Sequence, residues 1–190
     1  IKPLTIHIEK LNAKNEQEYE EWLSSFDTTL LYASLKYRDF LSRVLDKSEP
    51  TYLLAYSQDR LIGAMPLFLK YNERFGNVLN SLPFFGSNGG LIIEPQIDLR
   101  ATVQQALMEA YLSIAKDHRV IVSTIISNPL DPMVDFYEAN TLYTYRDERI
   151  GQITKLPSYY DSDEDLQEKL MGMYHKKTRN AIRKAQSSQI

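Results

Sequence analysis

The densest group of chemically active side chains lies near the end of the printed sequence, where nine positions hold five basic residues and no acid. They are Lys176, Lys177, Arg179, Arg183 and Lys184. On a helix, Lys176, Arg179 and Arg183 share one face. Because arginine binds phosphate or carboxylate through paired donors, we predict anion contacts at Lys177, Arg179 and Arg183. The alternative is a solvated charged face, or one that pairs with the acids at positions 161–165.

The second candidate is the loop Phe84–Gly90, in which two aromatic residues are followed by three glycines within five positions. Glycine permits tight turns and the close approach of another molecule. In one interpretation the phenylalanines fill the core and the glycines only turn the chain. In the other, Ser87 and Asn88 point into a substrate cleft, with Phe85 and Gly89 beside them. No nucleophile elbow surrounds Ser87, so the catalytic residues stay unknown at this point.

Composition excludes several other classes of function. The net charge of -3 gives no general reason to bind DNA. The chain has no cysteine, and its three histidines (His7, His118 and His175) lack the spacing of a zinc site, so we expect no metal. The longest apolar run, Leu61–Leu69, is interrupted by Pro66 and is too short to span a membrane. We therefore expect a soluble, cytoplasmic protein.

The elements that must position these residues can be read from hydrophobic periodicity. We predict an opening strand over 2–9, a helix over 16–26 and a second helix capped by Ser34. A hairpin over 51–57 and 61–71 follows, and the strand 77–82 continues it. Asp98 is expected to cap a long helix.

The second half of the chain supplies fewer strands. Residues 119–126 are strongly β-branched and predict a strand inside a sheet. Asp131 and Pro132 begin a short helix that ends near Asn140. Two closing strands, 142–146 and 150–156, precede a helical tail. The expected fold is α/β (α+β), with a mixed, mostly antiparallel sheet and helices on both faces.

This order of elements resembles the GNAT acyltransferase fold, and three strings carry a narrower resemblance. They are G-x-x-P-L-F-L from Gly63, S-L-P-F-F-G from Ser81, and K-x-R-x-x-I-R-K-A over Lys177–Ala185. Together they resemble the N-terminal GNAT-like half of the FemAB-like aminoacyl and acyl transferases. The resemblance favours the cleft interpretation of the loop Phe84–Gly90 and places the basic helix at the crossover between two domains.

The resemblance implies a GNAT-like domain over 1–157 and, over 158–190, a helical crossover to a second GNAT-like domain that is missing from this chain. It also implies transfer of an acyl or aminoacyl group to an amine, with acyl-CoA or aminoacyl-tRNA as donor. The acceptor is expected to be a small molecule or a peptide of a cell-wall precursor. The 190 residues alone are expected to be inactive.

Members of the GNAT fold hold the pyrophosphate of coenzyme A in the loop before the third helix, which here is Glu94–Ala101. This loop has no glycine, Pro95 has no amide hydrogen, and Glu94 and Asp98 repel phosphate. We therefore expect no cofactor in this domain alone. The alternative function is a non-catalytic binding or assembly module of GNAT-like fold.

Overall fold

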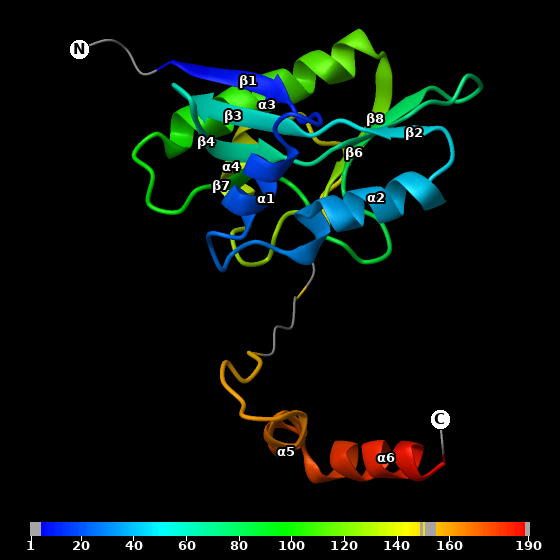
Figure 1. The fold of residues 1–190 in the computed structure, drawn as a ribbon. Coiled ribbons are helices and arrows are strands. Elements are labelled where there is room, and N and C mark those ends of the chain that lie inside the picture. Colours follow the sequence, from blue (N-terminus) through cyan, green and yellow to red (C-terminus); the bar gives the residue numbers. More distant parts are fainter. Residues whose placement is uncertain (1–4, 149, 151–154, 189–190) are drawn as a thin grey trace. The chain divides into compact units, whose positions relative to one another are not determined.

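A computed structural model describes residues 5–148, 150 and 155–188 (Figure 1). The chain divides into two compact units, Ile1–Arg146 and Asp147–Ile190, here called unit 1 and unit 2. This division does not test the predicted boundary after residue 157, which stays a prediction.

Unit 1 is built on two four-stranded sheets. The first has the order β1-β3-β4-β7, and each strand is antiparallel to its neighbour. Its strands are β1 (Ile6–Lys10), β3 (Leu53–Ser57), β4 (Arg60–Met65) and β7 (Ile92–Ile93). The predicted hairpin is confirmed as β3 and β4, which turn at Gln58 in a left-handed conformation.

The second sheet has the order β2-β5-β6-β8, in which only the pair β6 and β8 is parallel. Its strands are β2 (Ser48–Pro50), β5 (Phe68–Lys70), β6 (Asn77–Ser81) and β8 (Val120–Ile125). The predicted run 61–71 is divided between the two sheets at Pro66, which cannot donate a ladder hydrogen bond. The mixed, mostly antiparallel arrangement agrees with the predicted fold class.

Helices cover both faces of these strands (Figure 1). Unit 1 holds α1 (Glu16–Leu23), the short 3-10 helix η1 (Leu31–Ala33), α2 (Leu35–Val44), α3 (Arg100–Asp117) and α4 (Val134–Asn140). Along β3 the side chains alternate, so that Leu53 packs in a core with α3 while Leu54 packs in a second core with α1 and α2. Burial on both faces explains why β3 and β4 are apolar along almost their whole length.

One predicted helix cap is confirmed and another is wrong. The Ser34 hydroxyl accepts a hydrogen bond from the Tyr37 amide at the start of α2. At α3 the N-cap is Leu99 rather than Asp98, and no side chain caps the helix. Leu99 has a ψ of 10° because the chain enters α3 through a turn, in which the Arg100 amide bonds to the Ile97 carbonyl. Asp98 therefore lies one residue too early to cap.

In the second half, one strand prediction is confirmed only in part and another is wrong. The strand predicted over 119–126 is present as β8, but β8 is an edge strand of the described sheet rather than an inner one, and Ile121 is 62% exposed. Residues 142–146 form no strand, and Leu142 is fully exposed. Within the described residues, β8 pairs only with β6. Its β-branched composition therefore indicates a strand conformation and does not indicate a buried position in the sheet. Residues 151–154 of the last predicted strand lie outside the described residues.

Unit 2 contains the helices α5 (Asp163–Met173) and α6 (Lys176–Ser187). The Ser162 hydroxyl caps α5 by accepting from the Asp165 amide, as its acidic first turn predicts. Lys169 donates to the Tyr159 carbonyl and pairs with Asp165.

No helix within the described ranges has the length and apolar composition needed to cross a membrane.

Candidate functional site

The two sheets of unit 1 separate at a defined point. β6 and β8 run in parallel as far as the pair Ser81 and Ile125, and one further bridge joins Gly89 to Ser127. Residues 82–88 loop out between these two pairings. Beyond Gly89 the chain continues into β7, which pairs with β4 of the other sheet. After Gly89 the backbone no longer pairs with the segment that follows β8. Residues 90–91 therefore connect the sheet that contains β6 and β8 to the sheet that contains β7.

At this point a backbone amide meets a phenol. The amide of Leu91, a residue only 2% exposed, donates to the Tyr137 hydroxyl oxygen of α4 at 2.7 Å. Burial raises the pKa of Tyr137, so the phenol keeps its proton at neutral pH. The described chain provides no acceptor for that proton. A polarising amide and an unused phenol proton therefore lie together where the strands part.

Two glycines make this contact geometrically feasible. Gly90 has a φ of +86°, and a Cβ atom there would lie 2.5 Å from the Tyr137 hydroxyl oxygen. A Cβ atom on Gly89 would lie 2.4 Å from the Ser81 carbonyl oxygen. The Gly90 amide donates to the buried Ser81 hydroxyl at 2.7 Å, which fixes the backbone on the other side. The close approach that the sequence predicts for these glycines is thus made by the protein's own Tyr137 and Ser81.

The loop residues predicted to bind substrate have mixed surroundings. Ser87 is 1% exposed, and its hydroxyl donates to the Leu82 carbonyl at 2.5 Å and accepts from the Phe84 amide at 3.1 Å. The Asn88 amide group donates to the Ser127 carbonyl at 3.0 Å. Both side chains therefore shape the loop itself, and their predicted contact with substrate stays a prediction.

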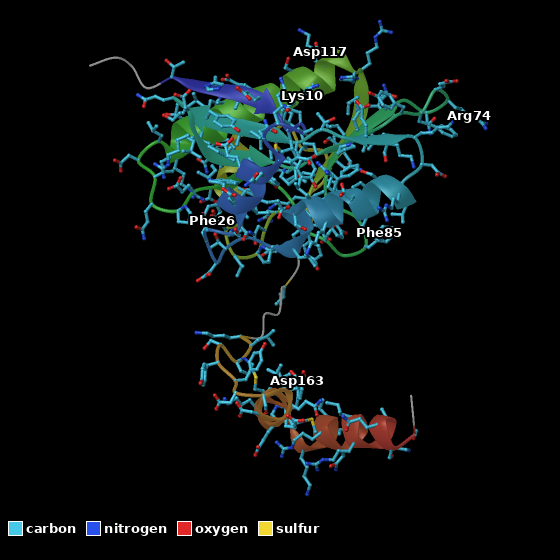
Figure 2. The ribbon with its side chains drawn as sticks, viewed as in Figure 1. Lys10, Phe26, Arg74, Phe85, Asp117 and Asp163 are labelled. Carbon is cyan, nitrogen blue, oxygen red and sulfur yellow. The ribbon has the colours of Figure 1, made fainter. Side chains whose placement is uncertain are left out.

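Phe85 differs from its neighbours because it faces solvent. It has a left-handed φ of +55° and is 73% exposed, with its ring 6.0 Å from that of Phe40 on α2. Figure 2 shows Phe85 beside α2. A left-handed bulky residue is strained, so this loop holds an aromatic ring outward at some conformational cost.

The predicted basic residues all lie on α6 of unit 2. Arg179 donates from Nη1 to the Tyr174 carbonyl at 2.9 Å, while Lys177 and Arg183 are exposed. In the acidic run, Asp165 pairs with Lys169 of its own helix. The anion contacts predicted for Lys177, Arg179 and Arg183 stay a prediction.

Two charged groups of the segment before α3 are paired with charges of the opposite sign. Glu94 forms an ion pair with Arg60, and the Arg100 amide is bonded to the Ile97 carbonyl. The Arg100 guanidinium pairs with Asp131 at 2.5 Å. Both of these guanidinium groups are therefore committed to carboxylates, and the expectation that this domain alone holds no cofactor stays a prediction.

Sequence reasoning missed Tyr137 and Leu91 entirely. The partner of the phenol is a backbone amide 46 residues earlier in the chain. Almost every residue has such an amide, so the amino-acid sequence does not indicate which one is used. The only available signal was a tyrosine in the short helix that begins after Asp131 and Pro132.

No protein-family model and no curated protein sequence matches the chain. Solved structures do match it in fold. A ribosomal-protein-alanine N-acetyltransferase from Brucella melitensis biovar Abortus 2308 has a TM-score of 0.56 at 11% identity, over 78% of this chain and 99% of the other. An aminoglycoside acetyltransferase from an uncultured soil metagenomic sample has a TM-score of 0.51 at 12% identity, over 80% and 97%.

An acetyltransferase from Trypanosoma brucei has a TM-score of 0.51 at 12% identity and is matched over its whole length, with 78% of this chain covered. At such low identities these likenesses concern the fold alone. The fold is GNAT-like.

Proposed function

We propose that this GNAT-like chain takes part in transferring an acyl or aminoacyl group to an amine, with the Leu91 amide and the Tyr137 phenol at the reaction centre. The observation that carries the proposal is the contact between these two groups where β7 parts from β8. The fold supports it, because the solved structures that resemble it in shape include acetyltransferases.

The two groups have complementary roles in acyl transfer. The carbonyl oxygen of an activated ester or thioester accepts the Leu91 N–H in place of the phenol oxygen, which stabilises the charge that develops when the amine attacks. A carbon–nitrogen bond forms and the carbon–sulfur or carbon–oxygen bond to the leaving group breaks. Tyr137 gives its proton to the leaving group, the attacking amine loses a proton to solvent, and Tyr137 regains one from solvent. No covalent enzyme intermediate is needed, because the acyl group arrives already activated.

The substrate contacts extend this proposal. Phe85, Ser87, Asn88 and Gly89 would border the acceptor, and the exposed ring of Phe85 supports that role. Lys177, Arg179 and Arg183 would contact the anionic part of the donor. The pairing of Arg60 and Arg100 with carboxylates near the start of α3 supports a separate anion site.

The narrower assignment rests on the sequence strings. We propose that residues 1–157 form the first GNAT-like domain of a FemAB-like transferase, that residues 158–190 lead to the second, and that the 190-residue chain is inactive without it. The K-x-R-x-x-I-R-K-A string, which lies in α6, supports this assignment.

The test compares the 190-residue chain with the full open reading frame, using acyl-CoA and aminoacyl-tRNA donors and a set of amine acceptors. We expect transfer only from the full open reading frame, and a loss of transfer when Tyr137 is changed to Phe. A full-length protein that transfers no acyl group from any donor supports the alternative of a binding or assembly module.

A further inference from the structure

The helix that carries Tyr137 is held in place by polar contacts as well as by partial packing against the core. α4 has seven residues, and none of its side chains is fully buried, although Phe136 and Tyr137 pack partly against the core. It starts from Met133, which has a left-handed φ of +47°. A helix this short has little stability of its own, so its position depends on what anchors its ends.

The contacts of α4 run in two directions. Glu138 pairs with Arg146, which ties α4 to the chain that follows it. Tyr137 accepts from Leu91 beside the sheet, and the Met133 sulfur accepts from Gln104 of α3 at 3.4 Å. The third contact is the ion pair between Asp131, just before α4, and Arg100, the first residue of α3.

We infer that Asp131 is a positioning residue, which sets the Tyr137 hydroxyl on the Leu91 amide through its ion pair with Arg100. Asp131 precedes the strained Met133, so fixing its carboxylate fixes the point from which α4 departs. Arg100 is a firm anchor, because α3 is 18 residues long and buries five side chains against the sheet.

The position of the ion pair agrees with this role. Both side chains are about one-third exposed, with 35% for Arg100 and 32% for Asp131, so water only partly screens their attraction. The Asp131 charge also contributes to the raised pKa of Tyr137, which agrees with a short path between the carboxylate and the phenol. The Asp131 amide bonds to the Asn128 carbonyl, so the backbone before α4 is held as well.

This inference rests on the proposed function for its meaning, but its test does not require activity. The measured quantity is the hydrogen-exchange rate of the Leu91 amide, followed by NMR in the protein without substrate. We expect Asp131→Asn to accelerate this exchange about fivefold to tenfold, since a local opening that costs less free energy occurs more often. Glu94→Gln is the matched control, because it breaks an ion pair with Arg60 that does not involve α4.

Two further variants separate positioning from a general loss of stability. Exchanging the charges with Arg100→Asp and Asp131→Arg should restore slow exchange at Leu91. In a Tyr137→Phe background, where the amide has already lost its acceptor, Asp131→Asn should add no further acceleration. In the active protein, Asp131→Asn should lower kcat about tenfold and leave KM unchanged.

The inference is overturned if Asp131→Asn leaves Leu91 exchange unchanged, or if it accelerates exchange equally in the Tyr137→Phe background. It is also overturned if the charge-exchanged pair stays as fast as Asp131→Asn. A normal kcat in Tyr137→Phe would instead contradict the proposed function, whatever the exchange rates show.

Discussion

The Leu91–Tyr137 pair of unit 1 and the basic helix α6 of unit 2 offer hydrogen-bond donors in opposite ways. The Leu91 amide is fixed by the backbone, belongs to a residue only 2% exposed and already has a partner at 2.7 Å. On α6, Lys177 and Arg183 are exposed. A fixed buried donor selects by position, whereas an exposed cation attracts anions broadly and is weakened by salt.

Under the proposed function, this difference implies that the two regions have different roles, one in catalysis and one in binding the donor. Catalysis by charge stabilisation needs donors that do not reorganise during the reaction, which suits the Leu91 amide. Binding the charged part of a large donor tolerates adaptable side chains, which suits α6. Each prediction below is directed at one side of this comparison.

The largest effect is expected from Tyr137→Phe, which removes the proton donor and the acceptor of the Leu91 amide. We expect kcat to fall by about 10²-fold to 10³-fold in the full-length protein, with little change in KM. The control is Tyr111→Phe, which also removes a buried hydroxyl, one that bonds to Ser123 rather than to Leu91. An equal loss of kcat in both variants would mean that general packing, not Tyr137, accounts for the effect.

The next effect tests the close approach at Gly90. Gly90→Ala places a Cβ atom against the Tyr137 hydroxyl, whereas the same change at Gly86, with a similar φ of +82°, meets nothing within 4 Å. We expect Gly90→Ala to lower the free energy of unfolding by about 1–3 kcal/mol more than Gly86→Ala does. Chemical denaturation measures the difference, and equal values for the two variants would contradict the described contact.

A smaller effect concerns alkaline pH. Because burial raises the pKa of Tyr137, the folded protein holds this proton more tightly than the unfolded chain does. The resulting stabilisation is complete below the unfolded pKa of about 10 and is lost as the pH rises through the folded value. We expect Tyr137→Phe to make the decline in stability above pH 10 shallower by up to about 1.4 kcal/mol per pH unit. Denaturation at a series of pH values measures this, and parallel declines in the two proteins would count against burial of the phenol.

The smallest effect is expected on the other side of the comparison. Changing Arg179 and Arg183 together to Ala should raise the KM for the donor about threefold to tenfold, with kcat and the stability of unit 1 unchanged. The increase should shrink in high salt, because exposed charges are screened. Lys184→Ala serves as the control on the same helix. An equal rise in KM for Lys184→Ala would mean that the total positive charge of α6, not Arg179 and Arg183 in particular, attracts the donor.

Much of unit 1 follows from local patterns. The β3–β4 hairpin, the Ser34 cap and the long helix α3 are set by hydrophobic period and by side-chain chemistry within a few residues. The position of β8 within its sheet does not follow from composition, because β-branched residues favour strands at an edge as well as inside a sheet. The cap was assigned to Asp98 because its residue type suits a cap, but the turn that precedes α3 moves the helix start beyond it.

The candidate site was less accessible to sequence reasoning. The basic helix could be recognised because its residues are adjacent and alike in type. The pair of Leu91 and Tyr137 could not, because it depends on where two sheets separate and on a backbone amide. Of the features of this site, only the glycines at positions 89 and 90 can be recognised in the sequence. Their pattern predicts the close approach of another molecule, whereas the groups that approach are Ser81 and Tyr137 of the same chain.

The most direct test of this account is a side-by-side measurement of kcat and KM for Tyr137→Phe and for the Arg179→Ala, Arg183→Ala pair in the full-length protein. We predict that the first variant changes kcat almost alone and that the second changes the KM for the donor almost alone. The account is contradicted if both variants alter the same constant, or if Tyr137→Phe retains the kcat of the unmodified protein.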